Sequence, residues 1–368
     1  MASPTITNIN ALLEPLSEEN PVGEDLRENT AASSRYSTIK DARHAARAAE
    51  RQNMFDDSST EATEHWDKII VLAPQILTTE AKDLEIASWY TEALIRKSGF
   101  SGLRDGFTLL RQLVEQYWEA GLYPAADEDG IETRVAPISG LNGEGSDGVL
   151  LTPMRKAAIT DDIAPGPFSL WQYQQAVALS RITDEREQEQ QASKMGFNME
   201  AIENTVAQCS SDYFVDLRDD ITICLTEYSA LSDLLSTHCG HEAPATRKIV
   251  ELLEETLSAV NHLAKDKFPL EEVTASDDDF AEEGQATSTH SAAQKGPISS
   301  REHAFRQLKS VADYFRSAEP HSPISYVLDK AVRWGDMPLD ALMNELIPDA
   351  ASRTTYSSLT GVKTDDND

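Results

Sequence analysis

Cysteine and basic residues are both scarce in this chain. Only three cysteines, Cys209, Cys224 and Cys239, occur among its 368 residues. An odd and small number of thiols argues against a disulfide framework and indicates reduced side chains that pack as small apolar residues. Lysine and arginine together number 32 against 63 acidic residues, which gives a formal net charge of -31. Such a charge repels the phosphates of nucleic acids and anionic membrane surfaces, so nucleic-acid binding is excluded as the main task.

The sequence also lacks a long hydrophobic run. It contains no stretch of about eighteen apolar residues, the length that a membrane-spanning helix needs. Its opening segment, MASPTITNINALLEPL, has neither the basic region nor the long apolar region of a signal peptide. We therefore expect a cytoplasmic protein that does not insert directly into a membrane. Hydrophobic residues make up 40% of the chain, which is enough for real cores, and the length favours two or three domains.

Motifs for phosphate and metal binding are incomplete. The glycines between residues 140 and 148 could suggest a phosphate loop, but no Gly-Lys-Ser/Thr follows them, and acidic residues lie among them. His238, Cys239 and His241 could supply metal ligands, but a structural zinc site needs four, and no second pair lies at the required spacing. Ordinary turns explain both segments.

No arrangement of side chains typical of catalysis is present in the sequence. His321 is followed by Ser322, but adjacent residues in a loop rarely face one another, and entry into a helix explains the pair. There is also no Ser/His/Asp order along the chain. The sequence therefore predicts no catalytic residues, no metal ligands and no cofactor, and an enzyme is the least favoured class.

The clearest helical pattern runs over residues 82–124. Apolar residues recur there at spacings of three and four on both sides of a Ser-Gly-Phe-Ser-Gly break at residues 98–102. The pattern predicts a helical hairpin whose two apolar stripes are too wide to leave in water. Its large side chains are expected to form the nucleus of an N-terminal core. These predicted core residues are Trp89, Phe107, Leu110 and Trp118.

A helix with one basic face is predicted over residues 36–51. The segment is rich in alanine, and its basic residues recur every three or four positions. They are Lys40, Arg43, Arg47 and Arg51. In so acidic a chain these side chains could contact an acidic partner, and they form our hypothesis for a partner contact. A solvated helix face is the simpler interpretation.

After the predicted hairpin, the sequence is expected to be rich in loops. Glycine, proline and acidic residues favour loops as far as residues 149–151, which could be a brief strand or the start of a helix. Residues 168–181 predict a short helix or docking segment. Its Trp171 and Tyr173 are expected to cover the N-terminal core.

The composition changes at residue 183. Residues 184–194 are charged and rich in glutamine, which indicates a linker or an exposed helix. Two long apolar patterns follow, over residues 202–235 and 249–263. Together they predict an antiparallel helical hairpin with its turn at residues 238–244.

An acidic, low-complexity segment at residues 269–297 separates this region from a last compact unit. Such a segment cannot bury enough apolar surface to offset the entropy of ordering it, so we expect a flexible linker. Residues 298–349 predict three short helices with apolar stripes, and residues 350–368 a flexible tail.

The last unit is expected to associate with copies of itself. A core of about fifty residues is too small to bury all its aromatic and aliphatic surface alone, and units of that size commonly gain stability by oligomerising. The side chains expected to pack in the unit or at its interface are Phe305, Phe315, His321, Pro323, Tyr326 and Trp334.

Several segments are informative when they are taken together and in their order along the chain. They are PVGEDLR at Pro21, YSTIKDAR at Tyr36, the hairpin segment from Lys82, the GLNGEG region, FSLWQYQQA at Phe168, the CGHEAP turn and EPHSPISYVLDKAVRWGDMPLDALMNELI at Glu319. In these segments the chain resembles the ImpA/TssA family of bacterial type VI secretion. The segments lie near both ends of the chain and through most of its middle.

The resemblance implies an all-α, cytoplasmic and structural protein. It implies a helical ImpA-type N-terminal domain over residues 1–182, a middle helical hairpin over residues 183–268 and a C-terminal domain over residues 298–349 that assembles into a ring. Members of the family act at the baseplate or at the distal end of the growing tail, where they help to recruit tube and sheath subunits and coordinate their polymerisation. The implied partners are further copies of the chain and subunits of the baseplate, sheath, tube and membrane complex. A monomeric cytoplasmic adaptor that binds subunits of the secretion apparatus is the alternative.

Overall fold

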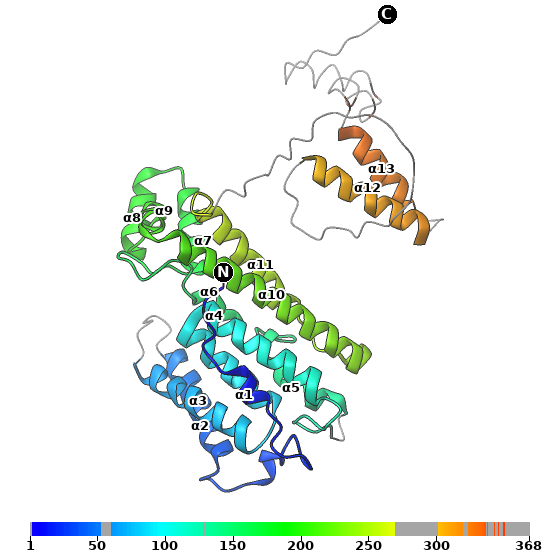
Figure 1. Cartoon of the computed structure of the whole chain (residues 1–368). Coiled ribbons are helices and arrows are strands. Elements are labelled where there is room, and N and C mark those ends of the chain that lie inside the picture. The colour runs from blue at the N-terminus through cyan, green and yellow to red at the C-terminus, as the bar shows by residue number, and fades with distance from the viewer. Residues whose placement is uncertain are drawn as a thin grey trace, which may run out of the picture. The chain divides into compact units, whose positions relative to one another are not determined.

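The computed structural model describes residues 2–52, 60–127, 130–268, 301–318 and 323–335, together with positions 337, 342, 345 and 349. These residues belong to two units, one within residues 1–274 and one within residues 275–368 (Figure 1). Every regular element in this part of the chain is a helix, so the predicted all-α class is confirmed. The linker predicted over residues 269–297 and the tail predicted over residues 350–368 lie outside the described residues.

Helix α4, Leu84–Tyr117, is the longest element of the first unit (Figure 1). Asp83 caps its N-terminus, because its carboxylate accepts hydrogen bonds from the backbone N–H groups of Glu85 and Ile86. At Gly99 the backbone takes φ 59° and ψ -142°, a conformation that favours glycine. The helical path therefore breaks at this residue, inside the break that the sequence predicts.

Two further glycines show that the second half of α4 runs back along the first. A Cβ atom added to Gly106 would lie 2.6 Å from the side chain of Thr91, and one added to Gly102 would clash with the carbonyl oxygen of Leu94. In a straight helix, residues 91 and 106 would be about 22 Å apart, so they can meet only in an antiparallel pair. The helical hairpin predicted over residues 82–124 is therefore confirmed.

Backbone hydrogen bonds close the open end of this hairpin. The N–H of Leu84 donates to the carbonyl of Tyr123 at 2.7 Å, and the N–H of Tyr123 donates to the carbonyl of Lys82 at 3.1 Å. The side chains that the sequence assigns to the N-terminal core are all buried in this unit: Trp89, Phe107, Leu110 and Trp118.

Three helices precede the hairpin: α1, Ile9–Leu13, α2, Arg35–Gln52, and α3, Thr60–Thr79. A short 3-10 helix, η1, Leu26–Glu28, lies between α1 and α2. Helices α1 and α3 pack against α4, and α2 packs against α3 (Figure 1). The face that α2 buries consists of one isoleucine and three alanines at spacings of three and four, which allows the close approach of α3.

The segment after the hairpin is more helical than its sequence predicts. The prediction of loops was wrong for α5, Ile131–Asn142. Helix α6, Leu151–Lys156, agrees with the alternative that a helix starts at residues 149–151. Helix α5 buries Val135, Ile138 and Leu141, at a spacing of three, although it also contains a proline and a glycine. Packing of this apolar stripe therefore outweighs the low helix propensity of those two residues.

Helix α7, Leu170–Ser180, is present as predicted, but the expectation that Trp171 covers the N-terminal core was wrong. Trp171 is 46% exposed, and its ring meets the edge of Phe197 with the centroids 6.5 Å apart. The neighbouring Leu170 is buried instead, and successive side chains on a helix point in directions about 100° apart. Tyr173 is half-buried and packs against the core.

The first unit continues with α8, Glu185–Met195, α9, Met199–Gln208, α10, Ser211–Cys239, and α11, Arg247–Leu263. Helices α10 and α11 pack against each other, and a 3-10 helix, η2, Gly240–Glu242, lies in the turn between them. The predicted antiparallel hairpin is therefore confirmed. The three cysteines are buried, as expected of thiols that pack as small apolar residues.

Helix α10 also packs along α4, so the segments before and after residue 183 share one core (Figure 1). The rings of Phe107 and Tyr228 meet with their centroids 4.6 Å apart. Nearby, Arg111 Nε donates to Glu227 Oε2 at 2.5 Å. The composition change at residue 183 thus falls inside one packed unit.

In the second unit, α12, Arg301–Ala318, and α13, Ile324–Gly335, pack against each other. Gly335 lies directly against the ring of Phe305, where an added Cβ atom would clash. Arg316 forms an ion pair with Asp329 of the other helix. The third helix predicted for this unit lies largely outside the described residues.

Substitution of Gly102 by alanine should destabilise the first unit, because the new Cβ atom would meet backbone atoms that cannot rotate away. We expect Gly102→Ala to lower the free energy of unfolding by about 1–3 kcal/mol, the usual cost of overpacking. The matched control is Gly140→Ala in α5, where an added Cβ atom meets nothing within 4 Å. It should raise the same free energy by about 0.5–1 kcal/mol. Urea unfolding followed by circular dichroism measures both, and equal effects would contradict the close packing of the hairpin.

Candidate interaction surfaces

The described residues offer no metal site and no membrane span. No group of three or more His, Cys, Asp and Glu side chains among them could hold a metal ion. None of the described helices combines the length and apolar character that crossing a membrane requires. In the last turn of α10, His238 stacks on the indole of Trp118, with the ring centroids 4.7 Å apart. An aromatic contact therefore accounts for the position of this histidine.

The basic face predicted on α2 divides into two exposed and two half-buried side chains. Lys40 and Arg51 are exposed, whereas Arg43 and Arg47 are half-buried. Burial lowers the pKa of Arg47, and the carboxylate of Glu92 opposes that change. A partner contact on this face stays a prediction, and Lys40 and Arg51 are the residues that a partner could reach without a change in the unit.

Arg43 is held inside the unit by Glu92 of α4. Its Nε atom donates to Glu92 Oε1 at 2.8 Å, and its Nη2 atom lies 2.6 Å from the same oxygen. The side chain of Glu92 is fully buried, and the Arg43 guanidinium also lies 5.4 Å from the centre of the Trp89 ring. A carboxylate removed from water needs such a partner, because desolvation strongly disfavours an isolated buried charge.

Beside Arg43 lies a hollow of about 490 Å³ that we name the charged cleft. Its walls come from η1, α2, α4, the segment 124–127 and α5, which lie far apart in the sequence. The charged and polar residues that line it are Asp25, Arg27, Arg43, Glu85, Ser88, Glu92, Asp127 and Thr133. Its apolar lining includes Trp89, Pro124, Pro137 and Val149.

Arg27 forms ion pairs with several carboxylates at one end of the charged cleft. Its guanidinium lies 3.0 Å from Asp25, 2.8 Å from Asp83 and 2.6 Å from Glu85. The hydroxyl of Tyr36 also donates to Glu85, at 2.9 Å. Burial raises the pKa of the Asp83 carboxyl, and the positive charge of Arg27 opposes that rise. Arg27 is thus shared among three carboxylates.

Two buried polar atoms of residues that line the charged cleft have no hydrogen-bond partner. Ser88 is 2% exposed and Glu92 is 0% exposed. Neither Ser88 Oγ nor Glu92 Oε2 is within reach of a donor or acceptor in the described part of the chain. Because the two residues are four apart on α4, they lie one helical turn apart on the same side of the helix. Sequence reasoning did not find this pair, since a serine and a glutamate on a helix give no distinctive signal.

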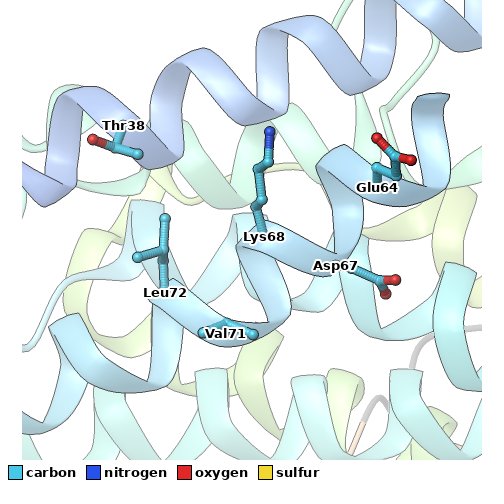
Figure 2. Close-up of a pocket in the computed structure, with 6 residues that line it drawn as sticks. All are labelled: Thr38, Glu64, Asp67, Lys68, Val71 and Leu72. Atoms are coloured by element: carbon cyan, nitrogen blue, oxygen red, sulfur yellow. The ribbon is translucent and has the colours of Figure 1, made fainter.

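A second and shallower hollow, of about 410 Å³, lies between α2 and α3 (Figure 2). It is lined by Thr38, Glu64, Asp67, Lys68, Val71 and Leu72. Figure 2 shows Lys68 extending from α3 toward α2. Val71 is 58% exposed, and Asp67 forms an ion pair with Lys97 at 2.7 Å. This hollow is an open surface with an exposed valine, without polar groups that converge on a common point.

Comparison with known proteins shows the family. The profile described as "ImpA, N-terminal, type VI secretion system" matches residues 13–143. Over 355 residues the chain is 24% identical to the type VI secretion system component TssA1 of Pseudomonas aeruginosa, covering 94% of this chain and 96% of that one. Residues 13–143 belong to the ImpA N-terminal family of type VI secretion. The resemblance drawn from the sequence is therefore confirmed.

A solved structure is similar in fold to this chain with its ImpA N-terminal region. It is the N-terminal domain, including the conserved ImpA_N region, of the TssA component from Burkholderia cenocepacia. The similarity has a TM-score of 0.58 at 24% identity and covers 72% of this chain and 96% of that one. The matched ImpA region, residues 13–143, contains both halves of α4 and the lining of the charged cleft except Val149.

The second unit exposes several large apolar side chains, which we name the α12–α13 face. Val311 and Tyr314 on α12 are 43% and 64% exposed. On α13, Ile324 is 43%, Tyr326 is 66% and Val327 is 61% exposed. Together these five side chains present apolar area that water solvates poorly.

The packing residues predicted for the second unit differ in how far they are buried. Phe305, Phe315 and Trp334 are half-buried, Pro323 and Tyr326 are exposed, and His321 lies outside the described residues. Sequence reasoning did not assign Val311, Tyr314 or Val327 to an interface. Val311 and Tyr314 each precede a position of the apolar stripe predicted for α12, and Val327 belongs to the stripe predicted for α13, so their exposure is seen only in the structure.

Replacing Arg43 by alanine should lower the free energy of unfolding far more than replacing Arg51 on the same helix. Arg43→Ala leaves the buried carboxylate of Glu92 without its partner, and we expect a loss of about 3–5 kcal/mol in the free energy of unfolding. Arg51→Ala is the matched control, because it removes the same charge from an exposed position, and its effect should stay within about 0.5 kcal/mol. Urea unfolding compares them. Similar small losses would show that Arg43 belongs to a solvated face.

Proposed function

We propose that this chain is a non-enzymatic assembly component of a type VI secretion apparatus that works as a homo-oligomer. In this proposal the second unit assembles copies of the chain into a ring at the baseplate or at the end of the tail. The first unit of each copy then contacts other subunits and helps to recruit and coordinate tube and sheath polymerisation. Membership of residues 13–143 in the ImpA N-terminal family supports a role within the apparatus.

The α12–α13 face is the single observation that supports self-association most directly. Its side chains are exposed although the two helices already pack against each other, so packing within the described part of the unit does not bury them. Because each side chain is only partly exposed, burying its remaining area against another copy would stabilise the assembly by roughly half of the about 1.5–3 kcal/mol that complete burial gives. A ring repeats the same contact around an axis and leaves no copy with this face in water.

A ring of this kind would present many copies of the first unit at high local concentration. Weak contacts from each copy then add up to firm attachment, because the second and later contacts are effectively intramolecular. We propose baseplate, sheath, tube and membrane-complex subunits as the partners and the cytoplasm as the compartment. The exposed Lys40 and Arg51 on α2 are our candidates for one such contact.

Two polar substitutions on α13 test self-association. Tyr326→Ser with Val327→Ser should weaken association of the full chain at least about tenfold, because each removes exposed apolar area that the proposed interface buries. Helix propensity changes little, since serine, valine and tyrosine are similar in this respect. Sedimentation velocity over a range of concentrations measures the association, and circular dichroism checks that the helices remain.

The chain offers a matched control for these substitutions. Val71→Ser on α3 changes a valine that is 58% exposed, close to the 61% of Val327, but it lies in the first unit. We expect this variant to sediment like the native chain. Unchanged association of the α13 double variant, or an equal loss with Val71→Ser, would contradict assembly through the α12–α13 face. A native chain that sediments as a single protomer would favour the monomeric adaptor instead.

A further inference from the structure

We propose that the charged cleft receives a lysine or arginine side chain from a partner protein. This inference rests on the proposed role as an assembly component, since it names the chemistry that the first unit would recognise on another subunit. Three features of the cleft favour such an occupant: the balance of charge along its walls, the two unpartnered polar atoms of residues that line it, and its apolar residues.

The walls of the charged cleft carry more carboxylates than guanidiniums. Four acidic residues line it, Asp25, Glu85, Glu92 and Asp127, against two basic residues, Arg27 and Arg43, so four minus two leaves an excess of two negative charges. Both arginines are already paired with carboxylates of the unit. An incoming anion would therefore meet net repulsion, whereas an incoming cation would be attracted.

The pairing of Arg43 leaves one carboxylate oxygen for another donor. Both of its close nitrogen atoms, Nε and Nη2, approach Glu92 Oε1, at 2.8 and 2.6 Å. Glu92 Oε2 is left without a partner, although an arginine often uses both oxygens of a carboxylate. A buried carboxylate oxygen with no donor is uncommon and costly. An ammonium or guanidinium group that displaces Arg43 slightly could supply the missing hydrogen bond.

Ser88 adds a second polar atom at the same place. Its hydroxyl is buried and unpartnered, and it lies one helical turn before Glu92 on α4. A serine hydroxyl can accept a hydrogen bond from a cationic donor and orient its own proton elsewhere. A hydroxyl and a carboxylate oxygen that both lack partners suit a group with several N–H donors, which lysine and arginine both provide.

The size and lining of the charged cleft favour a side chain over a bare ion. Its volume of about 490 Å³ is far larger than a single ion needs, and the described residues include no cluster that could hold a metal. Trp89, Pro124 and Pro137 supply apolar surface beside the carboxylates. Lysine and arginine bury their aliphatic stems on such surfaces while the charged end meets polar groups.

Short blocked peptides test this site on the full chain. The probes are acetyl-Gly-Arg-Gly-amide and acetyl-Gly-Lys-Gly-amide, with the citrulline peptide as the neutral isostere of arginine and the glutamate peptide as the anion. Saturation-transfer difference NMR should detect the arginine and lysine peptides, with weaker binding at high salt because exposed charges are screened. The citrulline and glutamate peptides should give at least about threefold weaker binding.

Variants place the binding in the charged cleft. Glu85→Gln keeps an acceptor for Arg27 and Tyr36 but removes one charge, and it should lower peptide affinity about threefold or more. Ser88→Ala should also lower affinity, and it removes an unpartnered hydroxyl, so folding is preserved. The matched control is Glu254→Gln, which removes the same charge from an exposed position on α11 and should leave affinity unchanged.

The outcomes separate this inference from the proposed function. Equal binding of the citrulline peptide, absence of binding by both basic peptides, or an equal effect of Glu254→Gln and the cleft variants would overturn the charged cleft as a site for a basic side chain. None of these readouts depends on the oligomeric state. A chain that binds the basic peptides but sediments as one protomer would keep this site and contradict the ring.

Discussion

The close contact between the two halves of α4 is the constraint on which the first unit depends. Gly102 and Gly106 carry no side chain where Leu94 and Thr91 approach, so two helices connected at Gly99 can lie against each other. Once they do, Glu92 lies on the side that meets α2, and Phe107 on the side that meets α10. The charged cleft and the long α10–α11 hairpin are therefore both positioned by the same helical pair.

Several of the scarce basic residues of this acidic chain are used inside it. Arg104 of α4 pairs with Asp105 at 2.8 Å and with Asp220 of α10 at 2.6 Å. Its guanidinium also donates to the carbonyl of Ser3 at 2.6 Å, so it joins the N-terminal segment to two helices. The buried ammonium of Lys82 similarly donates to two backbone carbonyls, each at 2.7 Å. Because these cations are committed to the interior, the surplus of negative charge is left for the surface, where it favours basic partners.

Helical periodicity predicted α2, the α4 hairpin and the α10–α11 hairpin, because each buries a stripe of apolar residues that local spacing reveals. It failed for α5, where three buried residues outweigh a proline and a glycine, and for the orientation of Trp171. It could not find the Arg43–Glu92 pair, since the two residues are 49 positions apart and meet only after folding. The predicted partner contact on α2 therefore included a residue that is committed to the core.

The two units divide the proposed work, since one exposes an apolar face and the other a cleft lined with charge. Assembly through the second unit is the central claim, and the masses of the full chain and of a version ending at residue 268 test it most directly. Sedimentation equilibrium at micromolar concentration should give several protomers for the full chain and one for the shortened version. A full chain with folded α12 and α13 that stays at the mass of one protomer would contradict the account.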